Sequence, residues 1–95
     1  MGEIGRTLAL PPVIDLDALD QVRDGLIDAV ETGPVTVDAA GVERVATNAL
    51  LMLVSAAETA RRNGHRFLIA RPSEQMRAAI RRLGLAEPFT PLLKG

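Results

Sequence analysis

The sequence predicts an α/β domain with a small mixed or mostly parallel sheet and packed helices. Three observations carry this prediction. Short runs rich in β-branched and aliphatic residues alternate three times with helical patterns, the connections between them are short, and glycine or proline stands at the boundaries. Ninety-five residues suffice for one hydrophobic core, so we expect residues 1–95 to form a single domain.

The chain opens with a strand candidate, Glu3 to Leu10, in which apolar and polar residues partly alternate. Pro11 and Pro12 end it, because proline cannot continue a ladder of hydrogen bonds. Asp15 follows, and an aspartate just before an apolar helical pattern is a good N-cap residue.

The first helix is predicted from Leu16 to about Glu31 and has the cleanest amphipathic pattern of the chain. Its apolar face consists of Leu19, Val22, Leu26 and Val30. Its opposite face consists of Asp17, Asp20, Asp24, Asp28 and Glu31. A column of carboxylates along a helix is not an oxygen cage, so it indicates a solvated face and no metal site. Gly33 and Pro34 end the helix.

The central stretch, Val35 to Asn63, holds a buried strand over Val35–Val37, a turn at Gly41 and a second helix. This order brings the hydroxyl of Thr47 to the start of the second helix. Backbone N–H groups are unpaired there and the helix dipole is positive. The hydroxyl can therefore cap the helix or receive a phosphate.

The second helix has an apolar face toward the sheet and a polar face opposite. At 100° per residue, the apolar face consists of Leu50, Leu53, Val54 and Ala57, with Ala60 at its edge. The polar face consists of Asn48, Ser55, Thr59 and Arg62. Leu51 and Met52 flank this polar face near the start of the helix. They form either a patch for a partner or a contact with a neighbouring loop or helix.

Gly64 is the expected residue just past the second helix. The run Arg66 to Ala70 predicts a third strand, and its continuous apolar residues predict burial on both faces. Ser73 can cap a third helix that runs to about Leu83.

The third helix has an inner stripe of Met76, Ile80 and Leu83, and Gly84 ends it. Its arginines, Arg77, Arg81 and Arg82, form either a solvated basic face or a site for a phosphate or a lipid headgroup. The tail from Leu85 to Leu93, with Phe89, should fold back on the core.

Composition excludes several classes of function. There is no cysteine, tryptophan or tyrosine, so disulfides, thiolate chemistry and cysteine-based metal sites are excluded. His65 is the one histidine, and no phosphate loop, nucleophile elbow or zinc signature is present. We therefore expect no enzyme, no cofactor and no metal.

The charges are unevenly distributed along the chain. Residues 1–43 carry a net charge of −7 and residues 44–95 carry +6. The basic part lacks the stacking aromatics of a nucleic-acid binder, so a nucleic-acid partner is not expected. The charge-free run from Val45 to Ala57 is too short to cross a bilayer, and no secretion signal begins the chain, which favours the cytoplasm without membrane insertion.

Several runs, taken in order and spacing, resemble the STAS domain, the family of the bacterial anti-sigma factor antagonists. The family pattern is a strand ending in Asp or Asn, a Val or Ile, and then Asp-Ser-Ser-Gly-Leu opening a helix. The matching runs are Val35–Asp38, Val42–Val45, Ala46–Leu50, Asn63–His65, Arg71–Ser73 and Leu83–Leu85.

In this family the residue matching Thr47 is phosphorylated by a partner kinase, and phosphorylation prevents binding. Here Ala46, Asn48 and Ala49 stand where the family has Asp, Ser and Gly. Asp15 matches a family acid near the switch residue. The short N-terminus leaves room for little more than one strand where many members have a hairpin.

The resemblance implies a non-enzymatic interaction module with a regulatory protein as partner, such as a histidine-kinase-type anti-sigma factor or a chemotaxis component. The alternative is an adaptor without phosphorylation, in a chemotaxis or membrane lipid-transport complex. A small-molecule binder has no specific support. The expected contact residues are Asp15, Asn48, Leu51, Met52 and Ser55.

Overall fold

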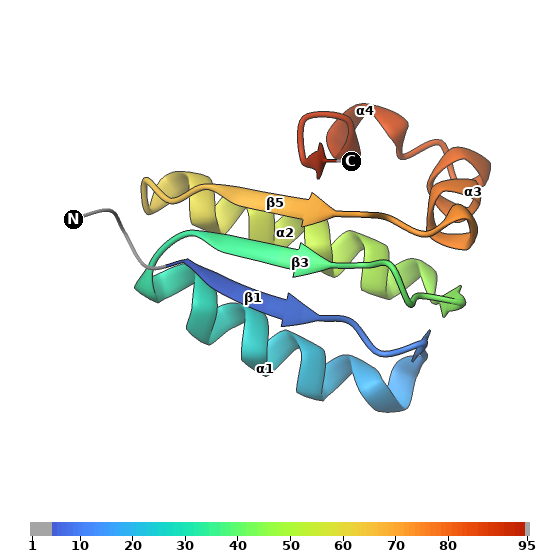
Figure 1. Cartoon of the computed structure of the whole chain (residues 1–95), viewed down its shortest axis with the longest axis horizontal. Helices are drawn as coiled ribbons and strands as arrows, with labels where there is room; N and C mark the ends of the chain where they lie inside the picture. Colours follow the sequence, from blue (N-terminus) through green and yellow to red (C-terminus); the bar gives the residue numbers. More distant parts are fainter. Residues whose placement is uncertain (1–4, 95) are drawn as a thin grey trace.

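The computed structural model describes residues 5–94, with the side chains of Leu16 and Lys94 excepted. The described part contains six strands and four helices (Figure 1). The strands are β1 (Arg6–Ala9), β2 (Val13–Ile14), β3 (Val35–Asp38), β4 (Arg44–Val45), β5 (Phe67–Ala70) and β6 (Leu93–Lys94). The helices are α1 (Leu16–Thr32), α2 (Thr47–Arg62), α3 (Glu74–Arg82) and α4 (Ala86–Phe89).

The main sheet has four strands in the order β1-β3-β5-β6, and every described pair is parallel. Its register aligns Leu8 with Val37, and Val37 with Ile69. Helices α1 and α2 lie side by side behind the sheet, while α3 and α4 lie at its β5 side (Figure 1). The predicted α/β class with a mostly parallel sheet is confirmed.

The two faces of the main sheet differ in burial. Val35, Val37 and Ile69 point to the helices and are at most 1% exposed. The residues between them, such as Thr36 and Leu68, remain half-buried. The prediction that the third strand is buried on both faces is therefore wrong. Its continuous apolar run reflects a parallel strand, but α1 and α2 cover one face.

The helix ends follow the local signals of the sequence. The Asp15 carboxylate accepts a hydrogen bond from the Ala18 N–H (3.0 Å) and caps α1. The Ser73 hydroxyl accepts one from the Met76 N–H (3.1 Å) and caps α3. Both predicted caps are confirmed.

Glycines end α2 and α3 in left-handed conformations. Gly64 has φ +77° and Gly84 has φ +70°. The next N–H in each case donates back into the helix, from His65 to the Ala60 carbonyl at 2.8 Å and from Leu85 to the Ile80 carbonyl at 2.9 Å. This bonding satisfies helix carbonyls that would otherwise lack a partner.

The core lies between the main sheet and the helices. Leu50, Leu53 and Ile69 are fully buried, and so is Phe89, which confirms that the tail folds back. Leu83 is 43% exposed, so its predicted place in the inner stripe of α3 is wrong. The helix ends at Arg82, and Leu83 turns outward as the C-cap residue.

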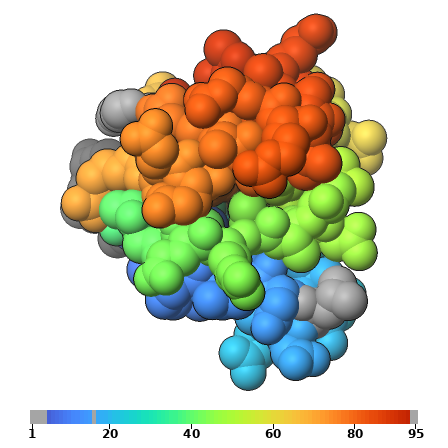
Figure 2. Space-filling model, turned by 90° about the vertical axis from the view of Figure 1, so that its right-hand side faces the viewer, coloured from blue at the N-terminus to red at the C-terminus, as the bar shows by residue number. Residues whose placement is uncertain are grey.

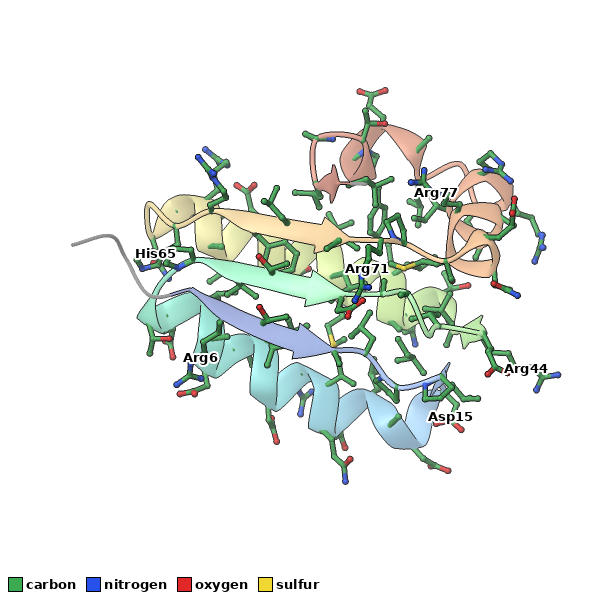
Figure 3. The ribbon with its side chains drawn as sticks, in the orientation of Figure 1. Arg6, Asp15, Arg44, His65, Arg71 and Arg77 are labelled. Atoms are coloured by element: carbon green, nitrogen blue, oxygen red, sulfur yellow. The ribbon has the colours of Figure 1, made fainter. Side chains whose placement is uncertain are left out.

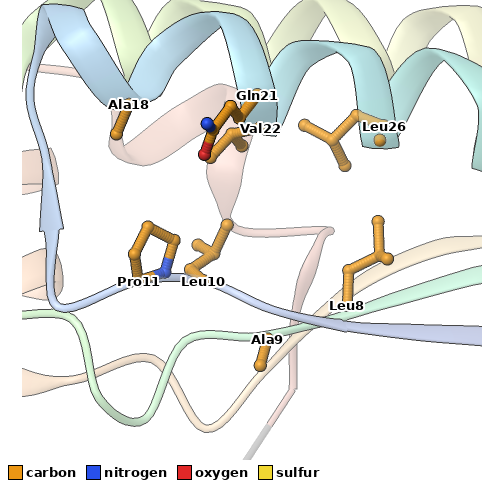
Figure 4. A pocket seen from close by; sticks show the side chains of 9 residues that line it. Leu8, Ala9, Leu10, Pro11, Ala18, Gln21, Val22 and Leu26 are labelled. Atoms are coloured by element: carbon orange, nitrogen blue, oxygen red, sulfur yellow. The ribbon is translucent and has the colours of Figure 1, made fainter.

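The N-terminal strand is shorter than predicted. β1 covers Arg6–Ala9, and Glu3 lies outside the described residues. β1 is an edge of the main sheet, and an uncharged groove of about 350 Å³ separates it from α1 (Figure 4). Leu8, Leu10 and Val22 are among the residues that line this groove.

No helix in residues 5–94 combines the length and the apolar character needed to span a bilayer.

Candidate functional site

A second, two-stranded sheet positions the start of α2. β2 and β4 pair in parallel, with Ile14 opposite Val45. The Ala46 N–H then donates to the Ile14 carbonyl (2.9 Å), and the Arg44 N–H donates to the Pro12 carbonyl (3.0 Å). These bonds tie the residue before α2 to the residue before Asp15. No local pattern in the sequence predicts this sheet, because its strands have two residues each and join distant parts of the chain.

The start of α2 differs from the prediction in one respect. Ala46 is the N-cap residue, with an extended backbone (φ −72°, ψ 151°), and no side chain caps the helix. Thr47 is the first helical residue and is exposed. The interpretation of Thr47 as a capping residue is therefore wrong. Thr47 lies one position after the N-cap, so its hydroxyl does not have the capping role that Ser73 has in α3.

The structure brings Asp15 close to this helix start. Asp15 and Ala46 line the same groove of about 590 Å³, between the β2–β4 sheet and α3. Arg44 and Arg82 also line it. Figure 3 shows Asp15 and Arg44 near one another at this end of the molecule, and Figure 2 views that end directly. Asp15 thus both caps α1 and lies beside the start of α2.

The predicted contact residues of α2 lie together on its outer side. Asn48 and Ser55 are exposed, and Leu51 is 47% exposed. Met52 is half-buried because it leans toward α1. Residues Thr47, Leu51 and Ser55 follow one another at four-residue spacing, which places them on one line along the helix. Of the two apolar side chains, Met52 is thus partly covered by a neighbouring helix and Leu51 is not.

Position 49, early in α2, has room for only a small side chain. Ala49 is fully buried, beside the fully buried Leu50. The apolar arc predicted from helical angles omitted Ala49, and it placed Ala60 at the edge although Ala60 is also fully buried. Val54, predicted within the arc, is half-buried. Both ends of α2 are therefore packed closely against the rest of the domain through small residues, Ala49 and Ala60, which the pattern of large apolar residues does not reveal.

A charged pair holds the loop that precedes β4. The Asp38 carboxylate accepts hydrogen bonds from the Ala40 N–H (3.0 Å) and from the Arg71 guanidinium. The Ala40 bond and then the Arg71 bond lower the pKa of Asp38 below its ordinary value. The Ser73 N–H donates to the Ala39 carbonyl (3.1 Å) in the same region. Asp38 is predicted as the end of a strand, but no local pattern in the sequence indicates Arg71 as its partner.

His65 and the arginines of α3 are the remaining polar candidates. His65 is half-buried, and within residues 5–94 its Nδ1 has no hydrogen-bond partner. No three His, Cys, Asp or Glu side chains of the described residues gather as metal ligands would. Arg81 and Arg82 are exposed, whereas Arg77 is half-buried. Within the described residues, the exposed side chains of α2 therefore remain the candidate surface for contact.

A family model described as Mlab, STAS domain, matches residues 3–94. The chain belongs to the STAS domain family. No curated protein matches it. STAS domains generally act as interaction modules in signalling, and they bind other proteins. The small α/β fold with parallel strands is consistent with a single STAS-like domain.

Proposed function

We propose that this STAS domain is a non-enzymatic interaction module that binds a regulatory protein through the outer side of α2, and that phosphorylation of Thr47 weakens this binding. The partner is an anti-sigma factor of the histidine-kinase type or a chemotaxis component. The observation that carries the proposal is the exposed Thr47 at an uncapped helix start, in line with the exposed Leu51.

The helix start is suited to hold a phosphate. Among the first N–H groups of α2, that of Ala46 donates to the Ile14 carbonyl and that of Ala49 to the Ala46 carbonyl, while no side chain caps those of Thr47 and Asn48. The positive end of the helix dipole also favours an anion. A phosphate on Thr47 would add about two negative charges without burying them, so the fold should tolerate the modification.

The same phosphate would disturb binding at Leu51. An apolar contact on Leu51 would remove water from a charge one helical turn away, and desolvating an unpaired charge is costly. Asn48, Met52 and Ser55 would complete the contact, with Asp15 at its rim. Modification would then change partner binding much more than it changes the stability of the domain.

Binding isotherms test the proposal. They are measured for the parent chain, Thr47→Glu and Thr47→Ser against the regulatory protein encoded beside this chain. We expect Thr47→Ser to bind like the parent and Thr47→Glu to bind more weakly, while both melt close to the parent temperature. Leu51→Ala should also weaken binding. If Thr47→Glu binds as tightly as the parent, the switch is refuted.

A second candidate is a STAS adaptor that holds a chemotaxis or membrane lipid-transport complex together without phosphorylation. Ala46 favours it, because the family has an aspartate before the phosphorylated residue. Incubation with the kinase encoded nearby, followed by mass spectrometry, separates the two candidates. Modified Thr47 supports the switch, and an unmodified chain that still binds through Leu51 supports the adaptor.

A further inference from the structure

An open groove runs between α1 and α2, and no other segment of residues 5–94 covers it. It has a volume of about 390 Å³. Leu26, Val30 and Ala56 form part of its apolar lining, and Met52 lies half-buried beside them. Ile27 also lines the groove and is 50% exposed, the largest exposed fraction among the big apolar side chains of the described residues.

The helix on one side of this groove is strongly acidic. The exposed carboxylates of α1 are Asp17, Asp20, Asp24, Asp28 and Glu31. Arg23 is the one base of α1, and its guanidinium lies 3.4 Å from the Asp20 carboxylate and 3.9 Å from that of Asp24. Helix α2 contributes to the lining only uncharged residues. Of the charged residues of α1, only Arg23 and Glu31 line the groove itself, and Asp28 is paired with Arg6 at 2.6 Å. The apolar floor thus lies beside a helix whose exposed surface carries a net negative charge.

We propose that this groove binds a basic amphipathic helix of a partner protein. A groove between two packed helices fits the ridge of a third helix, and the apolar side of such a helix would cover Ile27 and Met52. Lysine or arginine residues beside that apolar side would face the carboxylates of α1. Charge complementarity of this kind steers association and excludes acidic competitors.

The same charge pattern decides against two other occupants. A second copy of this chain docked through the same groove would bring two acidic α1 helices together, and like charges at an interface are costly. A bilayer surface with anionic lipids would repel α1 for the same reason. The groove between β1 and α1 has an uncharged lining, so no charge complementarity indicates which partner would bind there.

The groove goes beyond the contact surface proposed above. Met52 and Ser55 border both, but Thr47 and Leu51 do not line the groove. Binding in the groove should therefore respond to Ile27 and the α1 carboxylates, and it should not respond to Thr47. This separation makes the two proposals independently testable.

The experiment is a selection of helical peptides from a displayed random library on the intact chain. We expect the enriched peptides to combine apolar residues at helical spacing with flanking Lys or Arg. Ile27→Asp should raise their Kd by about tenfold or more, as for a central apolar contact. Leu83→Asp is the matched control, because Leu83 lies just past α3 and is 43% exposed, so this variant should leave the Kd unchanged. Ile27 is half exposed, so Ile27→Asp should melt near the parent temperature.

Other outcomes would overturn the proposal. Enriched peptides without basic residues, binding that survives Ile27→Asp, or no enrichment over an empty support would each do so. A dimer in light scattering that Ile27→Asp dissolves would assign the groove to a second copy instead. If Thr47→Glu abolishes peptide binding and Ile27→Asp does not, the groove proposal fails while the α2 contact stands. If the peptides bind as expected but Leu51 and Thr47 variants do not affect the regulatory partner, only the proposed function fails.

Discussion

The Asp38 carboxylate accepts a hydrogen bond from the guanidinium of Arg71, and this pair connects the end of β3 to the residue that follows β5. Arg71 has a left-handed backbone (φ 50°), which is unusual for a residue with a side chain. The pair, with the Ala40 N–H, fixes the turn from which the chain proceeds to β4 and the start of α2. A surface contact thus helps to position the candidate site.

This arrangement predicts a pH dependence of stability. The pKa of Asp38 is lowered in the folded chain, first by the Ala40 N–H and then by Arg71. A lowered pKa stabilises the fold above the ordinary value of 3.8, and this stabilisation is lost as the pH falls through the lowered pKa. Urea midpoints measured from pH 6 to pH 2.5 should therefore fall less steeply for Asp38→Asn than for the parent.

Arg71→Gln is the control for this prediction. It removes the guanidinium and leaves the Ala40 N–H in place, so its curve should lie between those of the parent and Asp38→Asn. Identical pH profiles for all three chains would show that Asp38 titrates alike in the folded and unfolded states.

The two leucines Leu53 and Leu51 should respond very differently to truncation. Leu53 is fully buried, so Leu53→Ala should lower the free energy of unfolding by about 2–5 kcal/mol. Leu51 is 47% exposed, and Leu51→Ala should change it by about 0.5 kcal/mol or less. Urea denaturation measures both. Equal losses would mean that the outer side of α2 is covered in solution.

Ala49 should tolerate no large side chain. It is fully buried in the first turn of α2, and Ala49→Leu should destabilise the fold by about 1–3 kcal/mol through overpacking. Asn48→Leu, at the exposed neighbouring position, is the control and should melt near the parent temperature. A neutral Ala49→Leu would reveal unfilled space beneath the helix start.

The sequence predicted the parts of the fold that local chemistry determines. Helices α1 and α3 have strong periodicity, an N-cap side chain and, for α3, a closing glycine, so both were found with nearly correct ends. The β2–β4 sheet could not be found, because two residues carry no period and their pairing joins distant segments. The one-sided burial of β5 depends on where the helices pack, which no single strand reveals.

The candidate site could likewise be predicted only where it depends on local sequence patterns. The exposure of Leu51 follows from its angle on α2, which periodicity gives directly. The N-cap at Ala46 depends on the Ala46 N–H bond to the Ile14 carbonyl, a contact outside the local sequence. The groove between α1 and α2 likewise arises from two helices packed side by side, so neither helix pattern alone predicts it.

Two hydroxyls near helix starts, Ser73 and Thr47, should differ in their value to the fold. The Ser73 hydroxyl accepts the Met76 N–H bond at 3.1 Å, so Ser73→Ala should cost about 1 kcal/mol. Thr47 follows the N-cap position and caps nothing, so Thr47→Ala should cost about 0.5 kcal/mol or less. Thermal melts of the two variants beside the parent measure the difference.

The same measurement bears on the role of Thr47 in binding. Thr47→Asp should be neutral or stabilise the fold by about 0.3–1 kcal/mol, because a carboxylate in the first turn of α2 favours the helix dipole. An equal loss in Thr47→Ala and Ser73→Ala would mean that the Thr47 hydroxyl caps α2 in solution, and its modification would then cost the fold a cap. If Thr47→Ala costs much less stability than Ser73→Ala, the Thr47 hydroxyl does not cap the helix and can face a partner or a kinase.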